Sequence, residues 1–368
     1  MLLTLCTALL LANPSIFDPK PPSKTPPAAP CKLPDPEPLS PEDCEAERLD
    51  LFRKNHWVIF TNVEFLLWTV NESALDFAIK MQEPSWSSSQ TYAAGKYKNA
   101  TFGWDPGVRF SFGYFNAPHY WDIMAQYTFL HADGENTVHA PHETDQFLNG
   151  TWIGPDFNTT SAASPLQKAH SKIDLYYNIV DGLFSRRFHP NPHFRMSLFG
   201  GATAAFIHQI WHVRYTDKEQ DLSKIKNKWS FDGAGARIGI TLDWFIRQNF
   251  YFSGMISNAI LSGVYKNHAF QNTNATVAGA NNTLPFRDTH FRDVRLVYTA
   301  QFFLGPSWQK AFKKVRTDLF AGYEFTVWNN LHEIYRSSLA GPSAGKDTYI
   351  NSSVMSLQGL TVRWNLDF

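Results

Sequence analysis

The chain has 368 residues, with 33 Lys and Arg against 33 Asp and Glu, so its formal net charge is zero. This balance gives no electrostatic basis for nucleic-acid binding, and a hydrophobic content of 43% excludes disorder throughout the chain. No apolar run reaches the roughly 18 residues that a helical membrane span needs. A membrane-spanning barrel stays open, because its strands alternate between apolar and polar residues.

The N-terminal region predicts export. Residues 2–12 form a short apolar stretch, which indicates a signal peptide over residues 1–12. Residues 13–54 are rich in Pro and are expected to form an extended periplasmic tail. Within this tail, Cys31 and Cys44 are predicted either to form a disulfide with each other or to crosslink to another chain, and the alternative is two thiols without a role.

From about residue 57 onward, the hydrophobic pattern alternates with a period of two. Segments such as 102–115, 120–130, 194–206 and 292–304 place apolar side chains on one face and Gly, Ser, Thr or charged side chains on the other. The segments reach about 10 residues or more, whereas strands of globular proteins peak at about 5–6 residues. Aromatic residues also gather towards the segment ends, as a membrane interface requires. We therefore predict an all-β fold, an antiparallel transmembrane β-barrel over residues 55–368, and disfavour a soluble sandwich.

The same rule assigns a face to every side chain of an alternating segment. It places Ile173, Leu175 and Tyr177 against lipid, and it places Lys172 and Asp174 in the lumen.

The polar connections alternate between long and short along the chain. In outer-membrane barrels the periplasmic turns are short and the extracellular loops are long, so 132–167 and 266–288 are predicted to be extracellular. With both ends in the periplasm, this alternation gives ten strands if residues 57–82 form one interrupted strand. A hairpin near 71–73 would require twelve.

Charged side chains of the polar face are predicted to line the pore, six of each sign. They either pair in ladders that close a narrow barrel, or they line a water-filled path with little ion selectivity. The predicted pore-lining residues are Arg109, Lys172, Arg195, Arg237, Arg295, Arg363, Asp122, Asp174, Asp243, Asp293, Asp318 and Glu324.

Residues 359–368 alternate without a break and end in an aromatic residue. We predict that Trp364, Leu366 and Phe368 form the assembly signal that the barrel assembly machinery reads in outer-membrane proteins.

No constellation of catalytic residues stands out. His208 and His212 would share a metal ion on a helix, but on a strand they lie about 13 Å apart. We predict no catalytic residue, no metal site and no cofactor.

Several segments resemble a known family. Residues 62–68 (NVEFLLW), 75–78 (LDFA), 104–114 and 121–129 look like the opening strands of the Legionella-type major outer membrane protein family. That family includes major-outer-membrane-protein-like porins of chlamydia-related bacteria, and the resemblance covers roughly 57–368. It implies an abundant, pore-forming barrel integral to the outer membrane, and it carries no catalytic residues.

The sequence therefore favours a porin, not an enzyme, that lets small hydrophilic solutes and ions diffuse across the outer membrane. The alternative is a surface structural protein or adhesin that acts through its extracellular loops. The expected partners are outer-membrane lipid, the barrel assembly machinery, small hydrophilic solutes and, in a homo-oligomer, a second copy of the chain. No nucleic acid is expected.

Overall fold

The computed structural model describes residues 57–81, 95–142, 147–152, 166–191, 193–216, 222–247, 249–277, 280–312, 315–337 and 348–368. The predicted signal peptide and the Pro-rich tail, with Cys31 and Cys44, lie outside these described residues.

The described residues form strands almost throughout, with one short 3-10 helix (η1) over Ala117–His119. The strands are β1 (Trp57–Glu72), β2 (Asp76–Met81), β3 (Gly95–Asn99), β4 (Asp105–Asn116), β5 (Trp121–His139), β6 (Phe147–Gly150), β7 (Lys168–Asn191), β8 (Phe194–Thr216), β9 (Leu222–Arg247), β10 (Phe250–Val277), β11 (Ala280–Ala311), β12 (Arg316–Ser337) and β13 (Thr348–Asp367). The prediction of an all-β fold is confirmed.

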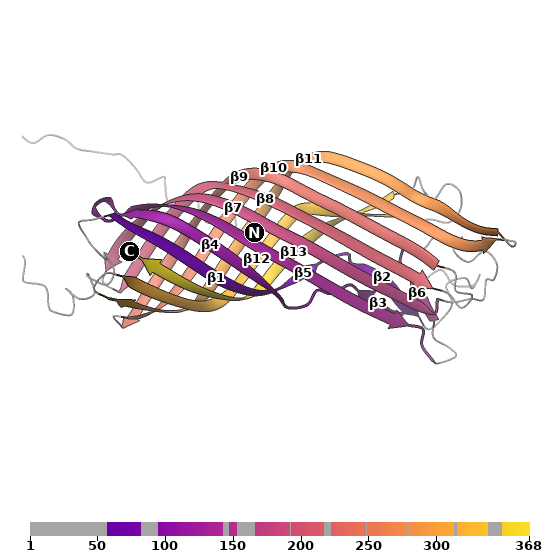
Figure 1. Ribbon diagram of the computed structural model, residues 1–368, viewed down its shortest axis with the longest axis horizontal. Coiled ribbons are helices and arrows are strands. Elements are labelled where there is room, and N and C mark those ends of the chain that lie inside the picture. The colour runs from indigo at the N-terminus through magenta and orange to yellow at the C-terminus, as the bar shows by residue number, and fades with distance from the viewer. Residues whose placement is uncertain are drawn as a thin grey trace, which may run out of the picture. The chain divides into compact units, whose positions relative to one another are not determined.

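Ten of these strands form a closed antiparallel ring, in the order β1-β13-β12-β11-β10-β9-β8-β7-β5-β4 (Figure 1). The ring closes because β1 pairs with β13 on one side and with β4 on the other. The other three strands form a small separate sheet, in the order β3-β2-β6. Within the described ranges, no helix is long and apolar enough to cross a lipid bilayer.

The two ends of the ring differ. At the near end, where β1 begins and the C-terminus lies, the turns between strands are short, as between Asn191 and Phe194 (Figure 1). At the far end the strands reach different lengths, and β10 and β11 stay paired as far as Val277 and Ala280.

Two predicted loops are therefore wrong. Residues 266–288 belong to the β10–β11 hairpin, and β5 continues through the start of the predicted loop at 132–167. Polar residues fill these strand extensions, so they lack the apolar alternation by which the sequence reveals a strand.

The predicted single strand at 57–82 is divided in two. β1 ends at Glu72, and the chain turns at Ala74, whose φ of 65° lies in the left-handed region. β2 then pairs with β3 and β6 instead of continuing in the ring.

The outer wall of the ring exposes apolar side chains at every second position. On β11, Val294 and Leu296 are 73% and 62% exposed, while Arg295 between them and Val297 after them are buried. Ile238 on β9 is 66% exposed. Exposed apolar side chains that alternate with buried ones form the outward belt expected of a barrel in lipid.

One strand shows the opposite alternation to the predicted one. On β7, Ile173 and Leu175 are buried at 0% exposure and face into the ring, and Tyr177 joins them at 5%. The predicted pore-lining Lys172 and Asp174 lie on the outer wall instead. The alternation was read correctly, but its faces were reversed, because the interior at this height is itself apolar.

Candidate functional site in the ring interior

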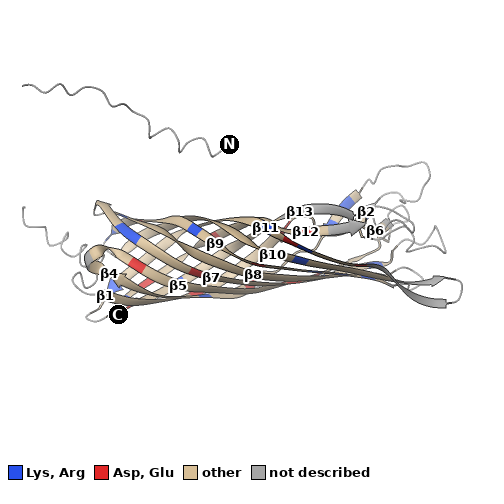
Figure 2. Cartoon of the chain, turned by 90° about the horizontal axis from the view of Figure 1, so that it is seen from above, with Lys and Arg blue, Asp and Glu red and all other residues tan. Residues whose placement is uncertain are grey.

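The near half of the ring interior holds a polar cavity of about 210 Å³. Both signs of charge lie along the strands near the C-terminus (Figure 2). Every basic residue that lines the cavity is an arginine, whose planar guanidinium group can bridge two carboxylates. The charged lining consists of Arg109, Arg187, Arg195, Arg237, Arg316, Arg363, Glu64, Asp122, Asp243, Asp318 and Asp367.

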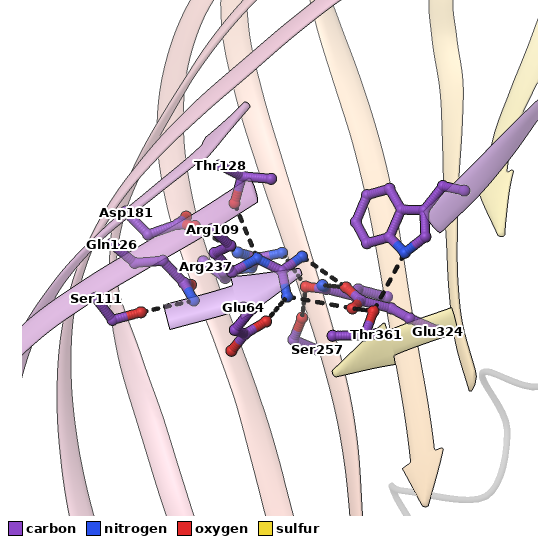
Figure 3. Close-up of polar contacts among 12 residues, drawn as sticks. Glu64, Arg109, Ser111, Gln126, Thr128, Asp181, Arg237, Ser257, Glu324 and Thr361 are labelled. Carbon is purple, nitrogen blue, oxygen red and sulfur yellow. Dashed lines mark hydrogen bonds and ion pairs between the residues drawn. The ribbon is translucent and has the colours of Figure 1, made fainter. Parts of the chain in front are cut away.

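Arg109 lies at the centre of a buried ion-pair network (Figure 3). Its Nη1 donates to Glu64 Oε2 at 2.6 Å, its Nη2 to Glu324 Oε1 at 2.7 Å, and its Nε to Thr128 Oγ1 at 3.0 Å. Glu324 also accepts a hydrogen bond from Thr361 Oγ1 at 2.7 Å, and its side chain is 1% exposed. Buried charges of this kind are tolerated only when they are paired and hydrogen-bonded.

The strand register explains why these residues meet. Arg109 on β4 lies directly opposite Glu64 on β1 and Thr128 on β5. Glu324 on β12 lies opposite Gly359 on β13, where a Cβ atom would approach the Leu67 carbonyl oxygen to 2.1 Å. A side chain at position 359 would clash with β1, so Gly359 permits the close approach of β13 to β1 beside Glu324.

Further arginines of the cavity pair with acidic residues of other strands. Arg195 Nε donates to Asp243 Oδ2 at 2.7 Å, and Arg187 Nε donates to Asp122 Oδ2 at 3.2 Å. Between β9 and β7, Arg237 Nη1 donates to Asp181 Oδ2 at 2.8 Å. These pairs correspond to the ladder alternative, in which the lumen charges neutralise one another.

Arg363 differs from the other arginines. In the described part of the chain its guanidinium group forms no ion pair or hydrogen bond, and its carbon Cζ lies 5.0 Å from the ring centroid of Phe320 and 5.8 Å from that of Phe303. A cation held mainly by aromatic faces keeps its N–H donors available to the cavity.

The predicted pore-lining residues divide into four groups. Seven line the cavity: Arg109, Asp122, Arg195, Arg237, Asp243, Asp318 and Arg363. Glu324 is buried within the network beside it. Asp293 and Arg295 form an ion pair of 2.8 Å towards the far end, apart from the cavity. Lys172 and Asp174 lie on the outer wall.

The sequence prediction missed five charged residues of this region: Glu64, Asp181, Arg187, Arg316 and Asp367. The alternation could have predicted two of them. Asp367 lies four residues after Arg363 and therefore shares its face of the strand, and Glu64 lies in the alternating part of β1. Asp181 was hidden because it shares the face of β7 that was assigned to lipid.

The far half of the interior is mostly apolar, with a few buried polar side chains such as Asn227, Asn267 and Gln271 among the apolar ones. Inward side chains of β1, β7, β8, β9 and β12 meet there in one buried cluster, which includes Trp68, Tyr177, Ile207, Phe231 and Trp328. Trp68 Nε1 donates to Thr361 Oγ1 at 3.2 Å, so the apolar cluster begins directly beside the Arg109 network.

The small sheet completes this apolar cluster. Phe77 on β2 is 0% exposed, and its carbonyl oxygen accepts a hydrogen bond from the hydroxyl of Tyr215 on β8. Trp152, just after β6, packs edge-on against Trp211 with ring centroids 5.1 Å apart. Gln271 on β10 donates to the Trp152 carbonyl oxygen at 3.1 Å. The sheet is therefore held against the inward faces of β8 and β10.

A buried His–Glu contact lies inside the apolar half. His332 Nε2 contacts Glu72 Oε1 with both side chains at 0% exposure, and the His332 ring stacks on Trp229 with ring centroids 4.8 Å apart. This pair ties β12 to the end of β1, next to the turn that leads into the small sheet.

Comparison with known proteins agrees with the ring and its outer belt. The family model of the Legionella pneumophila major outer membrane protein precursor matches residues 54–368. The chain belongs to this family. Members of the major outer membrane protein family are integral to the outer membrane, and so is this chain. The predicted resemblance is confirmed.

The solved structures add only weak similarity. The outer membrane protease OmpT from Escherichia coli is 8% identical, with 84% of this chain and 96% of that chain covered and a TM-score of 0.38. A FadL homologue of Pseudomonas aeruginosa is 7% identical, with 85% and 90% covered and a TM-score of 0.22. The CymD monoaromatic hydrocarbon channel is 8% identical, with 88% and 93% covered and a TM-score of 0.30. All three scores lie below 0.5, so these similarities carry no conclusion about activity. No curated protein matches the chain.

Proposed function

We propose that this member of the major outer membrane protein family is a porin, a ten-stranded transmembrane barrel that admits small hydrophilic solutes through the near half of its interior. The supporting observation is the arginine-rich cavity, because paired charges around a space of about 210 Å³ suit hydrated solutes. We propose no catalytic role and no cofactor for these residues.

The proposed orientation follows from the turns. The near end, with its short turns, faces the periplasm, and the far end, with the small sheet and the extended hairpin, faces outward. Passage then depends on the apolar cluster, because packed apolar side chains exclude water and ions. The small sheet acts as the gate in this proposal, since it contacts the wall through a few side chains such as Tyr215 and Gln271.

Planar-bilayer recording on the refolded chain tests this function. We expect small conductance steps for the wild type, and a larger or longer-lived open state for Phe77→Ala combined with Trp152→Ala, which removes two side chains that hold the small sheet in place. Phe110→Ala, on the exposed outer wall, serves as the control and leaves conductance unchanged. The absence of conductance steps in all three proteins, each shown to be folded by its strand signal in circular dichroism, removes the porin assignment.

A surface structural protein or adhesin is the second candidate function. One observation favours it: β11 stays paired with β10 to Ala280, whereas its pairing with β12 extends only to Tyr298. The hairpin thus continues beyond its neighbour on one side and presents both faces of its tip for contacts. A hairpin shortened between 270 and 288 separates the candidates, because it would retain conductance and lose binding to host cells only if the hairpin is the adhesive element.

A further inference from the structure

A band of basic side chains crosses the outer wall of the ring at the far end. It consists of Arg214 on β8, Lys224, Lys226 and Lys228 on β9, Lys266 on β10 and Arg292 on β11. All six side chains are exposed, and the residues next to them in sequence, such as Val213, Ile225 and Tyr265, are buried in the ring. The basic band therefore faces away from the cavity and from the pore-lining arginines.

The register places like charges directly opposite each other. Arg214 pairs with Lys224 between β8 and β9, and Lys266 pairs with Arg292 between β10 and β11. Like charges at opposed positions destabilise a sheet. Across the described residues, none of the six basic side chains forms an ion pair.

The acidic residues on the same part of the wall do not neutralise the band. Asp288 accepts a hydrogen bond from His268 Nε2 at 2.8 Å, and its Oδ1 also lies 3.6 Å from His290 Nε2. Asp232 lies on β9 on the same outer face. No carboxylate of the described residues lies within ion-pair distance of the six basic side chains, so the lysines and arginines form a positive strip that can bind an anion from outside the chain.

The position of the basic band relative to the apolar belt indicates which kind of anion it binds. On β11, Arg292 is followed on the same face by Val294 and Leu296, which are 73% and 62% exposed. Two residues of a strand span about 6.6 Å, so Arg292 and its register partner Lys266 lie at the edge of the apolar belt, at the depth of lipid head groups.

We propose that the basic band binds the phosphate groups of a glycolipid in the outer leaflet of the outer membrane. The cross-strand pairs Arg214–Lys224 and Lys266–Arg292 present two guanidinium and two ammonium groups, and guanidinium binds phosphate through two parallel hydrogen bonds. The choice of leaflet rests on the proposed orientation of the barrel, whereas lipid binding itself does not depend on conductance.

The test compares two double variants of the full refolded chain in phosphatidylcholine nanodiscs. Lys266→Gln with Arg292→Gln removes one like-charge pair of the band. Arg186→Gln with Lys310→Gln is the matched control, because both residues are exposed basic residues of the same wall at the near end. The probe is diphosphorylated lipid A, with enzymatically dephosphorylated lipid A as the second ligand, and native mass spectrometry measures binding.

We expect the band variant to bind diphosphorylated lipid A roughly 30-fold more weakly than wild type, from about fivefold per removed cation, and the control to stay within about twofold. Lipid A should raise the melting temperature of the wild type and not that of the band variant. Without lipid A, the band variant should be at least as stable as wild type, since a repulsive pair is gone.

Equal binding of lipid A by the wild type and the band variant would overturn the proposal. So would equal wild-type affinity for the dephosphorylated lipid, because the phosphates would then contribute nothing. Complete competition by soluble polyphosphate at the same phosphate concentration would assign the band to soluble anions and overturn its assignment to a lipid.

Discussion

The near and far halves of the ring interior are built from the same strands but differ in chemistry. On β7, the inward side chains change from Ser185 and Asp181 in the near half to Leu175 and Ile173 in the far half. β9 makes the same change, from Asp243 and Arg237 to Phe231 and Trp229. The near half contains a polar cavity, whereas the far half is packed.

The difference shows that one barrel interior can be stabilised in two ways. The near half relies on paired charges, which are stable only when both partners are present. The far half relies on apolar packing completed by the small sheet, as in a soluble core. The Arg109 network and Trp68 mark the boundary between them.

Removing the central carboxylate of the near half should have the largest effect. Glu324→Ala leaves the Arg109 guanidinium with one acidic partner and deprives Thr361 of its acceptor. We expect a loss of about 3–5 kcal/mol in the free energy of unfolding, measured by urea titration of the refolded protein in detergent. Glu135→Ala, on the exposed wall of β5, is the control. A loss for Glu324→Ala as small as that of the control would show that the network contributes little to stability.

The far half is tested by two neighbouring residues of β7. Ile173→Ala should cost about 2–5 kcal/mol, because it leaves a void in the packed cluster. Lys172→Ala, on the outer wall, should stay within about 0.5 kcal/mol of wild type. The reverse order in the same urea titration would restore the face assignment that the sequence alone predicted.

The smallest expected effect concerns ion preference in the near half. Arg363→Gln removes the cavity arginine that forms no ion pair within the described residues, so the reversal potential should shift towards cation preference in a salt gradient across a planar bilayer. Arg187→Gln also removes a positive charge, but it frees Asp122 to pair elsewhere, and we expect the smaller shift. Equal shifts would mean that pairing does not control which charges the permeating ions meet.

Period two predicted much of this structure from the sequence. It placed Arg109, Asp122, Arg195, Arg237 and Asp243 on the inward face, because most large apolar side chains of their strands face the membrane in the near half. It did not predict that the chain leaves the ring after β1 and returns only at β4. It indicated only an interruption of the strand near residues 71–73.

The same rule failed where the interior is apolar. In the far half of β7, Ile173 and Leu175 face inward and Lys172 and Asp174 outward, so alternation alone cannot say which face meets lipid. The inward packing of β2 and β6 depends on long-range contacts, such as that of Phe77 with Tyr215, which leave no local pattern. The extended β10–β11 hairpin was missed because polar residues occupy both of its faces.

Thiol labelling along β7 tests the division of the interior most directly. In a variant whose three native cysteines are replaced by Ser, single cysteines are introduced at Ser185, which lines the cavity, and at Leu175, which is 0% exposed in the apolar cluster. A water-soluble maleimide should modify Ser185→Cys rapidly, and Leu175→Cys should react only after unfolding. Equal labelling of the two folded proteins would show that water passes through the far half, which contradicts its apolar closure.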